Sequence, residues 1–358
     1  MYATQRLPAS LTPLDVALAA LLRALKPIAT NECPSREIPG SDAAEIPELK
    51  AWPPHDVAAV DGWALRASDL VGASSYSPLP LMTQPAWVEA GERIPDGCDC
   101  VLDDDAVDRT GPMVQVLAEA IPGQGIRRKG GEIADASRIV NAWRAGDLCR
   151  AAYRPRLRVV NIPDGVIAAK LIAGSLREAG IDVAFVEAPA RDAASIAEVL
   201  DTSACDLLLM IGGSGVGRTD ATVMALAQRG EIIAHGLALR PGCTAATGSI
   251  GAVPVIALPG APDQALAIWW TLVLPVLDRL SGRQKRDTIT LPLARKIASA
   301  VGIAEVALLE KADGAWMPLA IGDLPLEAIS RAQAWLLVPG GSEGYAAGTP
   351  VDAYMLRE

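Results

Sequence analysis

The chain has 358 residues, of which 51% are hydrophobic and 21% are charged, and its formal net charge is −10. This composition is typical of a globular protein, and the length favours two to four domains over one compact core. The negative charge argues against general binding of nucleic acids or anionic membranes. An anionic ligand would therefore need local basic groups, helix N-termini or a metal ion.

Cysteine, histidine and hydropathy patterns narrow the class of protein further. The six cysteines include no Cys-x-x-Cys pair, and with two histidines a zinc site has few available ligands. This pattern fits a reducing cytoplasm. The most apolar stretch, Ala265 to Leu277, contains Pro275 and is shorter than the roughly 20 residues of a membrane-spanning helix.

The N-terminal region begins with a predicted amphipathic helix. Thr12 can serve as N-cap and Pro13 as the first helical residue, and an apolar stripe follows at helical spacing, formed by Leu14, Leu18, Leu21, Leu22 and Leu25. We interpret this as a capped helix rather than a signal peptide. Beyond it, Asp61-Gly62 is a turn dipeptide that could present a carboxylate at a loop tip, or could be a hairpin turn alone.

From about Ser75 to Asn141 the pattern changes to short β-like runs separated by turns, which predicts a small inserted β domain. These runs are Pro85 to Glu89, Cys98 to Leu102, Met113 to Leu117 and Arg138 to Val140. An acidic run at residues 103–105 and a basic run at 127–129 are most simply solvated faces.

Strands and helices alternate from Arg156 to Gly282, which predicts a doubly wound α/β domain. The expected strands are Leu157 to Ile162, Ile181 to Val186, Leu207 to Ile211, a stretch near Glu231 to Leu239, and Val253 to Leu258. The expected helices are Gly165 to Ala179, Asp192 to Leu200, one that opens at Thr219 and ends at Gly230, and Pro262 to Leu280. The remaining stretch, Asp287 to Glu358, predicts a barrel-like β domain with one short helix near Leu326 to Ala334.

A glycine loop between Leu207–Ile211 and the next helix is the strongest candidate for a ligand site. It contains Gly212, Gly213, Ser214, Gly215, Val216 and Gly217 and is followed by Asp220. Glycines allow a ligand to approach the backbone closely, and free amides at the start of a helix attract phosphate or another anion. The spacing matches neither a dinucleotide fingerprint nor a Walker A loop, and a tight strand-to-helix connection is the alternative.

Several stretches in chain order resemble sequence boxes of the molybdopterin molybdotransferase family, which is similar to the C-terminal domain of gephyrin. Ala58-Ala59-Val60-Asp61-Gly62-Trp63-Ala64 resembles the family's Ser-Ala-Met-Asp-Gly-Tyr-Ala box, and the glycine loop resembles Gly-Gly-Val-Ser-Val-Gly-x-x-Asp. The other similar stretches are Ile94 to Val101, Gln124 to Gly130, Arg240 to Gly242 and Leu258 to Pro262. The resemblance covers nearly the whole chain.

This resemblance implies an α/β multidomain chain with four domains and an elongated homodimer. Residues 1–74 and 141–155 would form an N-terminal extended α+β linker and dimerisation domain, and 75–140 an inserted small β domain. Residues 156–282 would form the central doubly wound α/β molybdopterin-binding domain, and 283–358 a C-terminal β-barrel-like domain.

The resemblance also implies an activity: hydrolysis of adenylylated molybdopterin with release of AMP and insertion of molybdate, assisted by Mg²⁺, in the cytoplasm. The implied catalytic residues are Asp61, Glu132 and Asp220, with Asp61 and Asp220 as Mg²⁺ ligands. The implied ligand-binding residues are Gly212, Gly213, Ser214, Gly215, Val216, Gly217, Arg240, Pro241, Gly242, Pro259, Gly260 and Pro262. Partners would be molybdopterin, a second subunit and a molybdoenzyme client, with neither nucleic acid nor membrane.

The chain departs from the family pattern at several polar positions. The family's Thr-Gly-Asp-Glu segment is replaced by Ile162-Pro163-Asp164-Gly165, so its glutamate is absent. Cys243 stands in place of a lysine and Ala261 in place of an asparagine, which removes donors for an anionic ligand. These losses favour an alternative, a non-catalytic carrier or scaffold that binds molybdopterin or the mature cofactor, whereas the retained carboxylates favour an enzyme.

Overall fold

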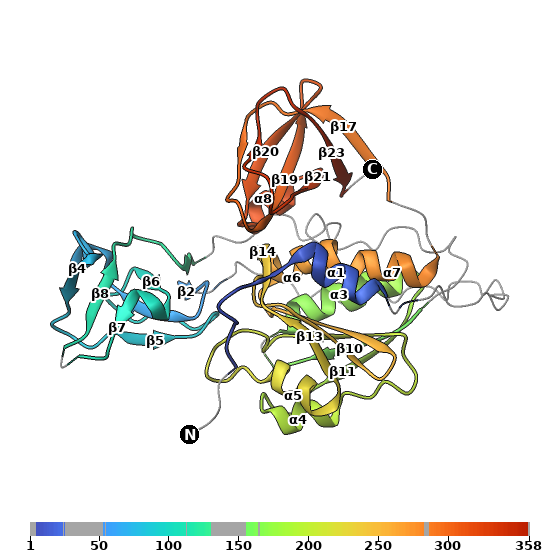
Figure 1. The fold of residues 1–358 in the computed structure, drawn as a ribbon, viewed down its shortest axis with the longest axis horizontal. Helices are drawn as coiled ribbons and strands as arrows, with labels where there is room; N and C mark the ends of the chain where they lie inside the picture. Colours follow the sequence, from blue (N-terminus) through green and yellow to red (C-terminus); the bar gives the residue numbers. More distant parts are fainter. Residues whose placement is uncertain are drawn as a thin grey trace. The chain divides into compact units, whose positions relative to one another are not determined.

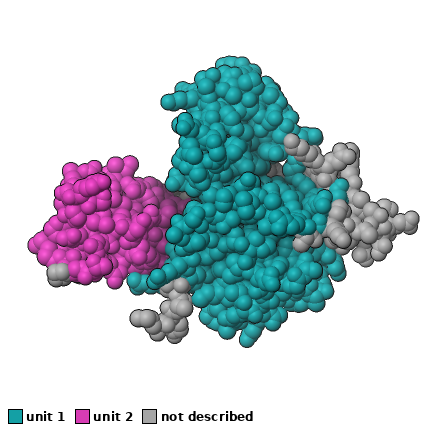
Figure 2. Space-filling view, in the orientation of Figure 1, with its two compact units in different colours: residues 1–48, 134–358 teal, residues 49–133 magenta. Residues whose placement is uncertain are grey.

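Two compact units make up the chain in its computed structural model (Figure 2). The larger unit contains Met1–Glu48 and Ala134–Glu358, and the smaller contains Leu49–Ile133. The structure describes residues 5–23, 25, 53, 55–111, 113–129, 155–163, 165–282 and 286–356. The predicted strand Arg138 to Val140 and the predicted catalytic Glu132 lie outside the described residues. The division into four domains stays a prediction.

A six-stranded mixed sheet, in the order β11-β10-β12-β16-β15-β13, forms the centre of the larger unit (Figure 1). Four strands are parallel to one another: β10 (Arg156–Asn161), β11 (Asp182–Glu187), β12 (Leu207–Ile211) and β16 (Val253–Leu258). β15 (Ala246–Ile250) is antiparallel both to β16 and to β13 (Glu231–His235). All five residues of β12 are buried, as expected for a central strand covered on both faces.

Helices cover both faces of this sheet, which confirms the predicted doubly wound arrangement. α3 (Val166–Glu178), α6 (Pro262–Ile268) and α7 (Leu274–Ser281) contribute to the same core as Leu207, Leu209 and Ile211, together with α1 (Leu14–Arg23). α4 (Ala193–Glu198) and α5 (Thr222–Arg229) pack with Leu208 and Met210 on the opposite face. Alternate residues of β12 therefore point into two separate cores.

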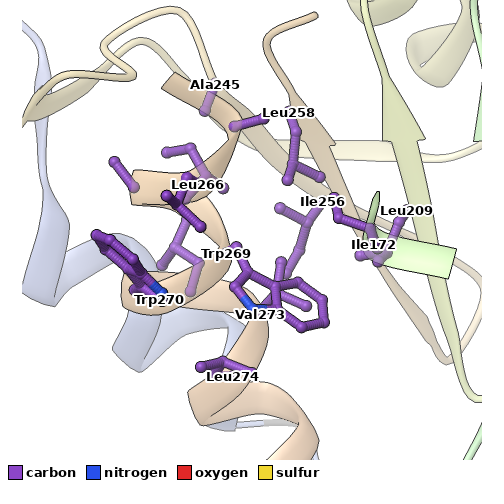
Figure 3. Close-up of a cluster of buried hydrophobic side chains, with 14 of the residues drawn as sticks. Ile172, Leu209, Ala245, Ile256, Leu258, Leu266, Trp269, Trp270, Val273 and Leu274 are labelled. Carbon is purple, nitrogen blue, oxygen red and sulfur yellow. The ribbon is translucent and has the colours of Figure 1, made fainter. Parts of the chain in front are cut away.

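The long helix predicted from Pro262 to Leu280 is interrupted by a π-helical turn, Trp269–Val273, between α6 and α7. Pro275, in the first turn of α7, has no backbone N–H to donate, which accounts for the local change in hydrogen bonding. Trp269 and Val273 of this turn lie in the core beside Ile256 and Ile172 (Figure 3).

The strand predicted near Glu231 to Leu239 is instead two strands that belong to different sheets. Gly236 has a φ of +85° and separates β13 from β14 (Leu237–Arg240). β14 joins the second sheet, whose path is β1-β14-β19-β21-β23-β17 with β20 paired to β19. β1 (Thr12–Pro13) therefore pairs with β14, and the first helix begins after it, at Leu14.

The C-terminal region is largely β-structure, as predicted. Its strands in the second sheet are β17 (Thr288–Pro292), β19 (Ala304–Ala312), β20 (Ala315–Ile321), β21 (Ala334–Val338) and β23 (Pro350–Met355). β18 (Ile297–Ala298) pairs with β22 (Gly344–Tyr345). The predicted short helix, α8, spans only Leu326–Arg331, because the chain turns into β21 at Ala334.

The smaller unit consists of short antiparallel strands around a core that includes Trp63, Leu70 and Val116. Its strand pairings are β2 (Val57–Ala58) with β9 (Ile126–Arg127), β3 (Gly62–Leu65) with β5 (Ala86–Val88) and β6 (Cys100–Leu102), and β8 (Gln115–Ala118) with β4 (Ser74–Pro80) and β7 (Val107–Asp108). These strands overlap three of the predicted runs. Across the described parts of both units, no helix has the length and apolarity that crossing a membrane requires.

Candidate functional site

The candidate site lies where the carboxyl ends of β10, β12 and β16 meet. Asn161 is in register with Ile211, and Ile211 with Leu258, so the loops that follow these strands start side by side. β11 lies on one side of β10, and β12 on the other, so the strand order reverses between β10 and β12. Ligands bind at such switch points in open α/β sheets. The predicted glycine loop, after β12, and Pro259 and Gly260, after β16, therefore lie at this edge.

Side-chain donors engage four consecutive carbonyl groups of the glycine loop. Thr222 Oγ1 donates to Gly212 O at 2.7 Å, and Gln5 Nε2 donates to Gly213 O at 2.7 Å and to Gly215 O at 2.6 Å. His235 Nε2 lies 3.0 Å from Ser214 O. A carbonyl can only accept, so Nε2 carries the proton of this imidazole. All four carbonyls are thus turned towards the protein.

The amides of the same peptide groups are left available. In a trans peptide the N–H points away from the preceding C=O, so engaged carbonyls at residues 212–215 turn the amides of residues 213–216 the opposite way. Over the described residues, the amides of Gly213, Ser214, Gly215 and Val216 find no acceptor. Successive amides directed to one side form a concave site for an anion. The Ser214 hydroxyl does not add to it, because Oγ is buried and makes no hydrogen bond to the described residues.

Both carboxylate oxygens of Asp220 form hydrogen bonds at the end of the glycine loop. Its Oδ2 accepts the amide of Gly217 at 3.1 Å, and its Oδ1 lies 2.9 Å from Nη2 of Arg191. The Asp220 side chain is 9% exposed and that of Arg191 is 29% exposed. Asp220 does not cap the following helix. The N-cap of α5 is Ala221, and the Val223 amide donates to Gln5 Oε1 at 3.1 Å.

The predicted residues Arg240, Pro241 and Gly242 lie before β15, at the same edge of the sheet. Ala246, the first residue of β15, pairs with Ala257 near the end of β16. The Arg240 side chain is 58% exposed, and its Nη1 is 3.9 Å from Oε1 of Glu305, so most of the guanidinium faces solvent. It can supply a bidentate donor pair to an oxyanion. Pro262 is the first residue of α6, which starts at this edge as well.

Asp61 lies in the smaller unit, just before β3. Its Oδ1 accepts the backbone amide of Ala90 at 2.8 Å. Asp61 and Asp220 belong to different units. Within the described parts of the chain, no group of three or more His, Cys, Asp or Glu side chains could hold a metal ion.

Sequence reasoning missed Gln5, Thr222 and His235, which hold carbonyls of the loop, and it missed Arg191, which pairs with Asp220. Gln5 is 208 positions from Gly213, and no local pattern marks it. His235 offered a weak signal, since it is one of only two histidines. Burial lowers the pKa of His235, and its hydrogen bond to Ser214 opposes this effect. The imidazole is therefore neutral at neutral pH, the state in which it can hold the Ser214 carbonyl through one N–H.

Comparisons with known proteins agree with this organisation. Residues 12–148 match the MoeA N-terminal region (domain I and II), and residues 167–279 match a family described as "Probable molybdopterin binding domain". Molybdopterin molybdenumtransferase 2 of Mycobacterium tuberculosis is 26% identical, covering 74% of this chain and 78% of the relative. Molybdopterin molybdenumtransferase 1 of that organism is 24% identical, covering 88% and 92%. The crystal structure of a molybdopterin biosynthesis MoeA protein from Pyrococcus horikoshii aligns with a TM-score of 0.53 and 22% identity over 98% of this chain and 100% of the other.

Proposed function

Because the chain belongs to the MoeA-like family of molybdopterin molybdenumtransferases, we propose that it acts in molybdenum cofactor biosynthesis by binding molybdopterin, or its adenylylated form, at the glycine loop. The observation that carries this proposal is the orientation of the loop. Four carbonyls are held by protein donors, and the four opposite amides have no acceptor among the described residues. Such a row of amides suits the phosphate of molybdopterin or the pyrophosphate of its adenylylated form.

The proposed reaction breaks the pyrophosphate bond of adenylylated molybdopterin. A water oxygen attacks one phosphorus, the pyrophosphate bond breaks and AMP leaves. Molybdate then bonds to the two sulfurs of the dithiolene, and one molybdate oxygen leaves as water with the two thiol protons. The amides of the loop would hold the phosphate oxygens and stabilise the negative charge that develops on them. Arg240, with its exposed guanidinium, would bind a second oxyanion bidentately. Asp61, Glu132 and Asp220 are the proposed catalytic carboxylates.

Magnesium would neutralise charge on the pyrophosphate when bound, but the described residues do not form a site for it. Both oxygens of Asp220 are engaged, by Arg191 and by the Gly217 amide. Mg²⁺ requires carboxylate oxygens in near-ideal octahedral geometry and usually retains several waters. A magnesium ion at Asp220 would therefore require Arg191 to leave this carboxylate.

The Asp220–Arg191 pair also favours the second candidate function, a non-catalytic carrier or scaffold for molybdopterin or the mature cofactor. In such a protein the aspartate would only brace the loop. The absence of the family's glutamate, lysine and asparagine points in the same direction. Cytoplasmic location, a homodimer and a molybdoenzyme client are part of the proposal for either function.

Anaerobic calorimetry with molybdopterin and adenylylated molybdopterin, with and without Mg²⁺, tests the binding site, and release of AMP tests the reaction. We expect wild type to bind both ligands and to release AMP when molybdate is present. Gly215→Val should abolish binding, because a β-branched side chain would obstruct the row of amides. Unchanged affinity in Gly215→Val would show that the ligand binds elsewhere. Tight binding by wild type without release of AMP would support the carrier rather than the enzyme.

A further inference from the structure

One side chain of the N-terminal segment, Gln5, forms three hydrogen bonds at the glycine loop. Gln5 is 6% exposed, its Nε2 donates to Gly213 O and Gly215 O, and its Oε1 accepts the amide of Val223. We propose that Gln5 is a positioning residue that keeps the loop in its anion-binding orientation. This inference rests on the function proposed above for the loop.

The hydrogen bonds of Gln5 determine which way two peptide groups face. A side-chain amide has two N–H donors, and here both are used on carbonyls of the same loop. Without them, the carbonyl of Gly213 would keep only the backbone amide of Thr222, at 3.0 Å. The carbonyl of Gly215 would be unsatisfied and free to turn towards the ligand side, since glycine has few steric restrictions. A carbonyl oxygen in that position would repel an anion and remove one of the amide donors.

The third hydrogen bond of Gln5 connects the loop to α5. The amide of Val223 belongs to the first turn of α5, where backbone N–H groups lack partners within the helix. Gln5 Oε1 supplies the missing acceptor at 3.1 Å. A single side chain thus bonds both to the loop and to the helix that follows it, and keeps the two in one arrangement.

The rest of the segment is anchored beside the second residue that holds the loop, His235. The amide of Thr12 donates to Gly236 O at 2.9 Å, and β1 pairs with β14. A Cβ added at Gly236 would lie only 3.0 Å from side-chain carbons of Leu7 and Leu11, so the segment packs tightly against this glycine. Gln5 and His235 are therefore held by the same stretch of structure, and together they engage three of the four carbonyls.

Two substitutions separate the donor role of Gln5 from its acceptor role. Gln5→Met retains the length of the side chain and removes all three hydrogen bonds. Gln5→Glu retains an acceptor for Val223 but has no N–H for Gly213 O and Gly215 O. The matched control is Gln228→Ala, an exposed glutamine on α5. Val351→Ala, in the core of the C-terminal sheet, controls for general loss of stability.

The test combines anaerobic calorimetry, with molybdopterin as the probe, and hydrogen exchange of the Thr222 and Val223 amides in the full chain. We expect Gln5→Met and Gln5→Glu to bind molybdopterin at least about tenfold more weakly, the effect of roughly one lost hydrogen bond. Exchange at Val223 should rise more in Gln5→Met than in Gln5→Glu. Gln228→Ala and Val351→Ala should retain both affinity and exchange at these two amides.

Each readout can overturn the inference. Unchanged exchange at Thr222 and Val223 in Gln5→Met would show that Gln5 does not hold the loop. Raised exchange with unchanged affinity would show that holding the loop does not matter for the ligand. A wild type that fails to bind molybdopterin would instead overturn the proposed function. In that case the exchange data would still decide whether Gln5 supports the loop.

Discussion

Replacing Asp220 with asparagine tests whether this carboxylate braces the loop through Arg191. Asparagine can retain one oxygen for the Gly217 amide, but its NH₂ group would then face the guanidinium that lies 2.9 Å from Oδ1 in wild type. Two donors cannot bond to each other, and the charge attraction is lost as well. We therefore expect Asp220→Asn to destabilise the larger unit.

The burial of the pair sets the size of this effect. Exposed ion pairs contribute about 0–1 kcal/mol, and breaking a fully buried pair costs about 3–5 kcal/mol. With side chains that are 9% and 29% exposed, the Asp220–Arg191 pair falls between these limits. We expect a loss of about 2 kcal/mol in the free energy of unfolding. This corresponds to a decrease in Tm of roughly 3–4 °C for a unit of this size.

Urea unfolding of wild type and Asp220→Asn measures this loss of free energy. Repeating the measurement with Mg²⁺ tests whether the metal binds at Asp220. The control is Glu310→Gln, because the Arg331–Glu310 pair has side chains that are 51% and 35% exposed and should contribute less than about 1 kcal/mol. We expect Mg²⁺ not to change the unfolding midpoint of the free wild-type protein, since Arg191 occupies the carboxylate. A stability of Asp220→Asn within about 0.5 kcal/mol of wild type, or a clear stabilisation of wild type by Mg²⁺ that the variant lacks, would refute this reasoning.

Three further predictions concern the loop, its histidine and assembly. Gly213→Ala should lower the free energy of unfolding by about 3 kcal/mol, measured by urea unfolding, because a Cβ there would lie 2.6 Å from Thr222 Oγ1. The control is Gly251→Ala, which is also at positive φ but in open space and should cost only about 1 kcal/mol. Burial lowers the folded-state pKa of His235, so folded protein binds fewer protons than unfolded protein. Stability should therefore fall as pH drops below about 6.5, and His235→Gln should weaken this dependence in unfolding curves from pH 5.5 to 7.5. Light scattering should report a homodimer at micromolar concentration, and a monomer throughout that range would contradict the assembly part of the proposal.

The sequence alone predicted the elements whose signals are local. The continuous apolar run of β12 and the glycines after it defined a buried strand and its loop, and the structure has β12 at the predicted bounds. β15 was missed because Thr247, Gly248 and Ser249 give neither an apolar run nor an alternating pattern. The division of one predicted strand at Gly236 was missed because it depends on tertiary contacts with β1 and β19.

The same distinction explains what could be predicted of the candidate site. The glycine loop is a local motif, but the groups that orient it come from Gln5, Arg191, Thr222 and His235, which lie in four separate stretches. Their partners are backbone carbonyls or a carboxylate that lie between 10 and 210 positions away along the chain, and a pattern in one stretch cannot specify such pairs. Local sequence therefore indicated where the amides lie, and only the fold determined which way they point.

The chain's overall charge gives this orientation a further consequence. In a protein with a formal net charge of −10, an anion at the carboxyl edge of the sheet meets an unfavourable field unless local groups offset it. The charge of Asp220 is balanced by Arg191 at 2.9 Å. Among the described residues, the exposed guanidinium of Arg240 and the backbone amides of the loop can attract an anion, and the dipoles of these amides are effective only while their carbonyls are turned away. Because neutral dipoles are screened less by salt than a distant charge, loss of loop support should weaken ligand binding even at high ionic strength, where loss of Arg240 should matter less.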